Sequence, residues 1–227
     1  MHLVILLLLI LALVFGPQFW ARSVLTRYSK PQDHFPGNGE EFARHLLNKA
    51  GLASVKIEQT TLGDHYDPTD RCVRLSEENF AGKSLTAVAV AAHEVGHAIQ
   101  HHNNDPKLMM RARLVRIAQV TEKLGSLAMF AVPVLVGFTR APSVGALMFF
   151  IGLLSLGVST LVHLVTLPVE WDASFGKAMP MIKAGQYLTH AEERAAKKIL
   201  RACALTYFAA SLSSLLNIWR WIRFIRR

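Results

Sequence analysis

His93-Glu94-Val95-Gly96-His97 is the stretch of sequence on which the interpretation of the whole chain depends. On an α-helix, residues four apart lie on one face, so His93 and His97 can present their ring nitrogens to a single metal ion. Glu94 stands beside that face, where a carboxylate can take a proton from a metal-bound water. This spacing is typical of zinc hydrolases, and it predicts a metal-binding helix.

The sequence around the motif supports a helix of that kind. Ser84 or Thr86 can cap it, it runs through the motif to about His102, and Pro106 marks its end.

A short folded module precedes this helix. The pattern predicts a helix over Glu40–Ala50 closed by Gly51, strands over Val55–Gln59 and Cys72–Leu75, and a turn at Tyr66-Asp67-Pro68. Together with the metal-binding helix, these elements predict a small α+β zincin-like module.

A third metal ligand must come from elsewhere, because a catalytic zinc takes three protein ligands and keeps a fourth position for water. Leu167-Pro168-Val169-Glu170-Trp171-Asp172 places two carboxylates at the start of a new helix, where Pro168 suits the first turn. We expect Glu170 to be this ligand. Asp172 is the alternative ligand, or an outer acceptor that orients one of the histidines.

Two other zinc arrangements are disfavoured. His101 continues the row of histidines, but three points along one straight helix cannot close around a metal. Another zinc-protease clan has a third histidine six positions after the motif; here Asn103 stands there, and Gln100 replaces the glycine which that clan requires.

The composition predicts an integral membrane protein that is mainly α-helical. Hydrophobic residues make up 52% of the 227 positions, which is high for a soluble domain. We expect about four transmembrane or membrane-associated helices from the apolar runs at about Leu3–Phe19, Leu124–Phe138, Val144–Leu167 and Ile199–Trp219. The last run is diluted by polar residues, and it either spans the bilayer or lies in its interface.

These patterns divide the chain into five segments. They are an N-terminal transmembrane anchor (1–20), the zincin-like module (21–118), a transmembrane hairpin (119–168), a helical segment with the third ligand (169–198) and a C-terminal transmembrane or interfacial helix with a basic tail (199–227). Cys72 and Cys203 fall in different predicted elements, so we expect two free thiols.

The net charge of +9 is accounted for by lysines and arginines at the edges of the apolar runs. A lipid bilayer is therefore the expected partner, and nucleic acid is not. More of these residues flank the segments on the side of the metal-binding helix, which favours a catalytic site on the cytoplasmic face of a bacterial inner membrane. The arginine tail conflicts with this orientation unless the last helix is interfacial.

The chain resembles the YugP-like putative neutral zinc metallopeptidase family of bacterial membranes. The resemblance covers most of the chain and is carried by four blocks: Asp64–Pro68, Arg74–Ser76, Ala91–Gln100 and Leu167–Ser174. It implies a membrane-bound peptidase with one zinc ion per chain, held by the two histidines of the motif and a downstream carboxylate.

The chain departs from related enzymes at one position. In the wider glutamate-ligand zinc peptidases, an aspartate usually follows the ligand glutamate by four residues, and here Ser174 stands there. The partner of the first histidine is therefore open, and Asp172 is a candidate for the role.

These observations predict a zinc metalloendopeptidase that hydrolyses a polypeptide substrate through a zinc-activated water, with Glu94 as general base. The strand at Cys72–Leu75 is the expected edge for an extended substrate. One alternative is an intramembrane zinc protease with the metal-binding helix in lipid. Another is a membrane scaffold that holds zinc for structure alone.

Overall fold

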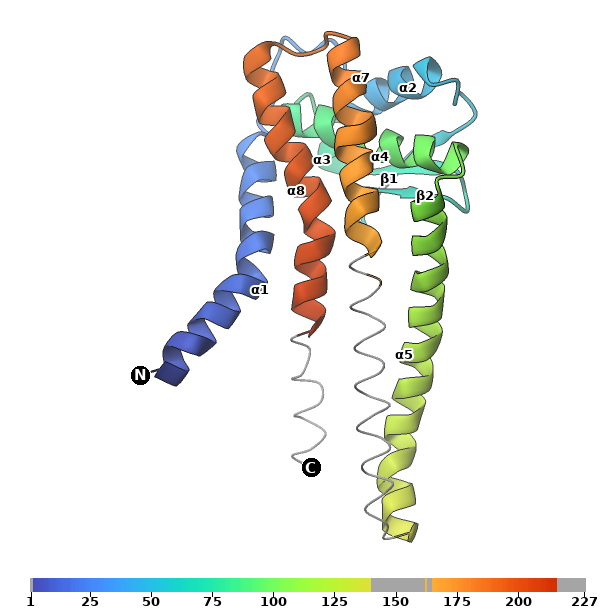
Figure 1. The fold of residues 1–227 in the computed structure, drawn as a ribbon. Coiled ribbons are helices and arrows are strands. Elements are labelled where there is room, and N and C mark those ends of the chain that lie inside the picture. The colour runs from blue at the N-terminus through green and yellow to red at the C-terminus, as the bar shows by residue number, and fades with distance from the viewer. Residues whose placement is uncertain (1, 140–161, 163–164, 216–227) are drawn as a thin grey trace.

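The computed structural model describes residues 2–139, 162 and 165–215. This part of the chain is mostly helical with one small sheet, as expected. Its elements in order are α1 (His2–Arg27), α2 (Gly39–Lys49), β1 (Lys56–Thr60), β2 (His65–Asp67), β3 (Cys72–Ser76), α3 (Glu77–Phe80), α4 (Leu85–His102), α5 (Pro106–Thr139), the π-helix η1 (Asp172–Ala178), α7 (Met179–Ala184) and α8 (His190–Leu215). The long helices α1, α5 and α8 extend away from the end of the molecule that holds the sheet (Figure 1).

The sheet has the strand order β1-β3-β2. β3 pairs in parallel with β1, with Cys72 opposite Lys56, and antiparallel with β2, with Val73 opposite Tyr66. β3 is therefore the central strand, so the expectation that it offers a free edge is wrong. β2 forms where a turn was predicted, and its three residues are too few to show an alternating pattern.

Hydrogen bonds to the carboxylate of Asp64 hold the short strand β2 in place. The carboxylate of Asp64 accepts hydrogen bonds from the backbone and side chain of Ser76 and from the side chain of Asn79, at 2.7 to 3.0 Å. These bonds tie the start of β2 to the end of β3, so the returning chain lies antiparallel beside it.

The predicted helix boundaries in the module are confirmed to within one or two residues. Asn38 and Glu41 form a reciprocal capping box at the start of α2, and Gly51 follows the helix with a φ of 73°. At α4, the side chain of Ser84 accepts a hydrogen bond from the backbone of Ala87, so Ser84 rather than Thr86 is the cap.

Helix α4 is enclosed by the rest of the fold. Every residue from 85 to 98 is buried, and α2, η1 and α8 pack against it. Its many alanines allow neighbouring backbones to approach closely. At Gly96, an added Cβ atom would lie 2.7 Å from the carbonyl oxygen of Ala173 in η1.

The expectation of an integral membrane protein is wrong for the part of the chain that the structure describes. Within residues 2–139, 162 and 165–215, no helix combines enough length with enough apolar character to cross a bilayer. In α8 the apolar run has another use, because Ile199, Leu200 and Ala202 are fully buried in the protein core. Most of the run at Val144–Leu167 lies outside the described residues. The segment boundaries, the bilayer as partner and the cytoplasmic orientation stay predictions.

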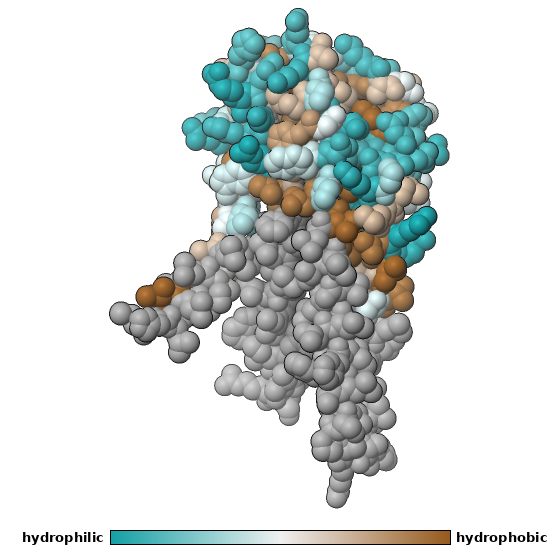
Figure 2. Space-filling model, viewed as in Figure 1, coloured by the Kyte–Doolittle hydropathy of each residue, from teal (hydrophilic) through white to brown (hydrophobic). Residues whose placement is uncertain are grey.

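The surface agrees with a folded module at one end of the molecule. On the face shown in Figure 2, hydrophilic residues cover most of the end that holds α2 and the sheet, and hydrophobic residues lie nearer the long helices. Cys72 and Cys203 are both buried and unpaired, as expected.

Because η1 approaches Gly96 closely, we expect one added methyl group at this position to destabilise the protein. Replacing Gly96 with alanine should lower the free energy of unfolding by about 1–3 kcal/mol, because the backbone of η1 cannot move aside as a flexible side chain would. Gly16 lies in α1, and outside the adjacent helix backbone nothing lies within 4 Å of its added Cβ, so Gly16→Ala should be neutral or stabilising, by at most roughly 1 kcal/mol. Denaturant unfolding of the two variants measures this difference, and equal stability would show that α4 and η1 do not meet as described.

Candidate metal centre

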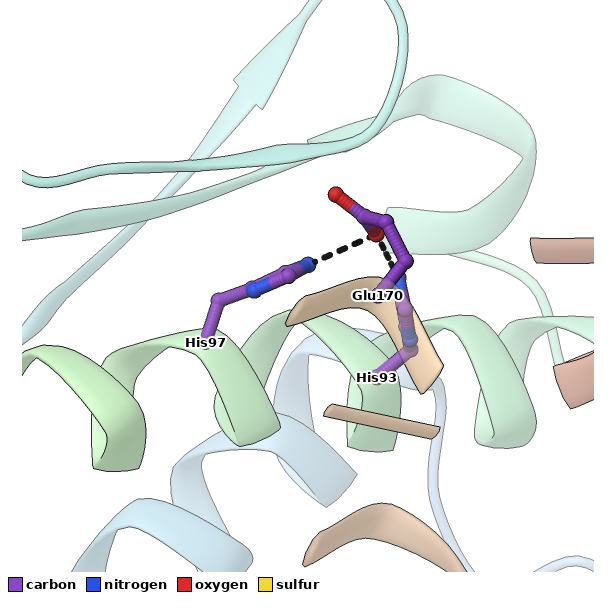
Figure 3. A group of neighbouring side chains, drawn as sticks. All are labelled: His93, His97 and Glu170. Carbon is purple, nitrogen blue, oxygen red and sulfur yellow. Dashed lines mark hydrogen bonds and ion pairs between the residues drawn. The ribbon is translucent and has the colours of Figure 1, made fainter. Parts of the chain in front are cut away.

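Two histidines and one glutamate converge inside the fold. Nε2 of His93 lies 3.2 Å and Nε2 of His97 3.1 Å from the same oxygen, Oε2 of Glu170. The three possible ligand atoms all lie within 4.8 Å of one another. Figure 3 shows both imidazoles rising from α4 toward the carboxylate, which comes from a separate helical segment.

The local folds explain this geometry. One turn of α4 separates the histidines and places their rings 4.8 Å apart and nearly perpendicular, so their Nε2 atoms point at a common place. Glu170 lies in the helical residues 165–171, directly before η1. The close contact of η1 with Gly96 brings this segment against α4. The structure therefore brings Glu170 together with the two histidines, and its role as the third metal ligand stays a prediction.

The hydrogen bonds of Ser174 determine that Nδ1 of His93 carries a hydrogen. Its hydroxyl donates to the carbonyl oxygen of Leu200 in α8 at 2.9 Å, and its oxygen lies 3.0 Å from Nδ1 of His93. A hydroxyl has one hydrogen, which is already used, so Nδ1 of His93 must be the donor in this pair. Ser174 thus fills the place where related peptidases have an aspartate, and Asp172 does not.

His97 is fixed in the same way by Gln100. Nδ1 of His97 lies 2.9 Å from the amide oxygen of Gln100, which can only accept. Both Nδ1 atoms therefore carry hydrogen, and both Nε2 atoms are directed at a carboxylate oxygen.

This arrangement fits a metal ion. Because each Nδ1 atom carries a hydrogen, the Nε2 atom of a neutral imidazole would turn its lone pair toward the negatively charged Glu170. That repulsion is relieved if each Nε2 atom is protonated or if a cation lies between the imidazoles and the carboxylate. Imidazole nitrogens with one carboxylate oxygen are the donor set of catalytic zinc sites. The three side chains are between 0% and 6% exposed, so their ligand atoms are largely shielded from bulk water.

Glu170 is held as an anion. Burial by itself would raise its pKa, but the charge on His97 and the hydrogen bonds from His93 and His97 outweigh burial and lower the pKa. Its second oxygen, Oε1, lies 3.1 Å from Nη1 of Arg111 in α5. That contact lacks hydrogen-bond geometry, so Oε1 is a buried oxygen without a hydrogen bond.

Glu94 lies beside the three possible ligands but is not one of them. It is 5% exposed, and burial raises its pKa, although the charges on His93 and His97 act in the opposite direction. A buried carboxylate with a raised pKa next to a metal site can accept a proton and give it back.

The remaining candidates lie outside the ligand group. A carboxylate oxygen of Asp172 accepts a hydrogen bond from the amide nitrogen of Gln100 at 2.9 Å and lies 3.4 Å from Nζ of Lys177. His101 pairs with the hydroxyl of Tyr66 at 2.9 Å, one turn beyond the site.

Sequence reasoning missed the roles of Gln100 and Ser174. Ser174 was visible as a departure from a pattern, while Gln100 was noted only as the absence of a glycine.

Comparisons with known proteins give the family of the chain. Residues 3–226 match the protein family described as "Putative neutral zinc metallopeptidase". The chain is 36% identical over 214 residues to the "Putative membrane protease YugP" of Bacillus subtilis (strain 168), covering 93% of this chain and 91% of that protein. No solved structure matches. The chain therefore belongs to the neutral zinc metallopeptidase family that this description names.

Proposed function

We propose that the chain is a zinc-dependent endopeptidase, with His93, His97 and Glu170 as the metal ligands and Glu94 as the general base. The observation that carries the proposal is the convergence of the three buried ligand atoms within 4.8 Å. The family supports zinc and peptide hydrolysis as the metal and the reaction.

Zinc bound at this centre would polarise the peptide carbonyl and make an attacking water more acidic. Glu94 then removes a proton from that water and delivers it to the leaving amine. Its burial beside His93 and His97 keeps the carboxylate close to the place where both transfers occur. No covalent intermediate with the protein is needed.

The sheet suggests where an extended substrate binds. Within the described part of the chain, β3 is paired on both sides, whereas β2 has a paired strand on one side only. β2 also lies against α4, the helix that carries His93, Glu94 and His97. A polypeptide that adds to the free edge of β2 through backbone hydrogen bonds would pass close to the metal centre, largely independently of its side chains.

The two alternatives receive less support. An intramembrane protease would expose the metal-binding helix to lipid, but α4 is enclosed by α2, η1 and α8. A purely structural zinc site would fill all four positions with protein ligands, and the described residues bring together three.

The ligand assignment predicts metal content. Purified wild-type protein should carry about one zinc ion per chain, because three ligands of this type bind zinc tightly. Glu170→Gln should lose most of it, since the amide removes the charge that faces both imidazoles. Asp172→Asn should keep it, because Asp172 contacts Gln100 and Lys177 instead. Elemental analysis of folded protein measures all three.

Two results would contradict this assignment. Loss of zinc in Asp172→Asn with retention in Glu170→Gln would make Asp172 the ligand. Absence of any bound metal from wild type supplied with zinc would remove the basis of the proposal.

The general-base assignment predicts a separation of binding from catalysis. Glu94→Gln should keep its zinc and lose at least about 100-fold in hydrolysis rate, because the amide cannot accept the proton of the attacking water. Glu78→Gln, at an exposed glutamate of α3, is the matched control and should cleave like wild type. Cleavage of a labelled, unfolded protein such as reduced casein is the assay, and full activity in Glu94→Gln with zinc present would refute this role.

A further inference from the structure

We infer that Gln100 is a positioning residue that locks two of the metal ligands, His97 and Glu170, into one rigid unit. This inference rests on the proposed metal centre but goes beyond it. Gln100 is 1% exposed, which is unusual for a side chain with two polar ends, and the hydrogen bonds of its side chain are made to His97, Val169 and Asp172 within the site.

The chemistry of the amide fixes its orientation. The nitrogen of Gln100 donates to the carbonyl oxygen of Val169 at 3.0 Å and to the carboxylate of Asp172 at 2.9 Å. Both partners are acceptors without a hydrogen to give, so turning the amide over would place its oxygen against two other oxygens. The oxygen of Gln100 must therefore face His97, where it accepts the hydrogen from Nδ1.

This orientation controls how His97 meets the metal. An imidazole held by a hydrogen bond from Nδ1 leaves Nε2 for coordination and cannot rotate freely. The amide nitrogen of Gln100 donates to the backbone carbonyl of Val169, directly before Glu170, and to the side chain of Asp172, two residues after it. One side chain thus joins α4 to the segment that carries the carboxylate ligand, across 69 to 72 residues of sequence.

Ser174 ties the other histidine to the same segment, because it lies in η1 four residues after Glu170, and its hydroxyl also donates to the carbonyl oxygen of Leu200 in α8. Gln100 differs from Ser174 in that its side chain starts from α4 and makes two hydrogen bonds to the Glu170 segment, one on each side of the ligand. Its loss should therefore disturb the relative placement of two ligands, and not only the tilt of one ring.

The test measures zinc affinity of the full-length protein by competition with a chromophoric chelator. Gln100→Leu keeps the approximate size of the side chain and removes all three hydrogen bonds, and zinc affinity should fall about 10- to 100-fold. The matched control is Thr166→Val, which removes a buried hydroxyl that donates to the carbonyl oxygen of Val162, away from the metal ligands, and it should bind zinc like wild type. Unchanged affinity in Gln100→Leu would overturn the inference.

A second pair of variants keeps the test decisive if Gln100→Leu does not fold. Gln100→Glu can still accept from His97 but opposes the carboxylate of Asp172, so zinc affinity should fall although the added negative charge would by itself attract zinc. Gln100→Glu combined with Asp172→Asn restores a donor and an acceptor across that contact, and it should recover part of the affinity. Tighter binding by Gln100→Glu alone, or no recovery in the double variant, would contradict the bridging role.

The absorption spectrum of the cobalt-substituted protein gives a readout that ordinary loss of stability does not move. Its visible bands depend on the arrangement of ligands around the ion, so they should shift in Gln100→Leu and stay unchanged in Thr166→Val. Identical spectra would show that Gln100 does not set ligand geometry. If zinc binds as expected but wild type cleaves no peptide, the proposed function fails while this inference stands or falls on the affinities.

Discussion

The burial of the Glu170 carboxylate is the constraint on which the rest of this structure depends. A fully buried anion costs several kcal/mol unless positive charge and hydrogen bonds replace the water it has lost. Its surroundings supply both, because His93 and His97 approach one oxygen and Arg111 lies beside the other. A divalent ion in this place would take over the role of protons on the two Nε2 atoms, with a larger positive charge.

Helix α4 carries the two histidines and packs so closely that they reach the carboxylate of Glu170. It is buried on all sides along residues 85 to 98, so its polar residues must be satisfied inside the protein. Ser174 in η1 and Gln100 in α4 itself satisfy the outer nitrogens of the histidines, and Gln100 is in turn bonded to Val169 and Asp172. The small residues of α4, above all Gly96, let η1 come close enough for these bonds to form.

Much of the centre could be predicted from sequence because its information is local or chemically restrictive. The spacing of His93 and His97 and the need for a further acidic ligand pointed to Glu170 without knowledge of the fold. The roles of Gln100 and Ser174 depend on contacts across 69 to 81 residues, which spacing does not reveal. Hydropathy failed for a related reason: apolar runs also occur in helices that pack inside a protein, as Ile199 and Leu200 do in α8.

The partners of the two histidines also affect how the centre would act on a substrate. Related peptidases place an aspartate where this chain has Ser174, whereas here neither histidine contacts a carboxylate through its outer nitrogen. A divalent ion with one carboxylate ligand would keep a net positive charge, and the described partners of the outer nitrogens, Gln100 and Ser174, are neutral and do not offset it. Arg111 adds positive charge beside Glu170. Because hydrolysis places negative charge on the peptide oxygen, a centre whose histidines are held by neutral groups retains more of its positive charge to stabilise it.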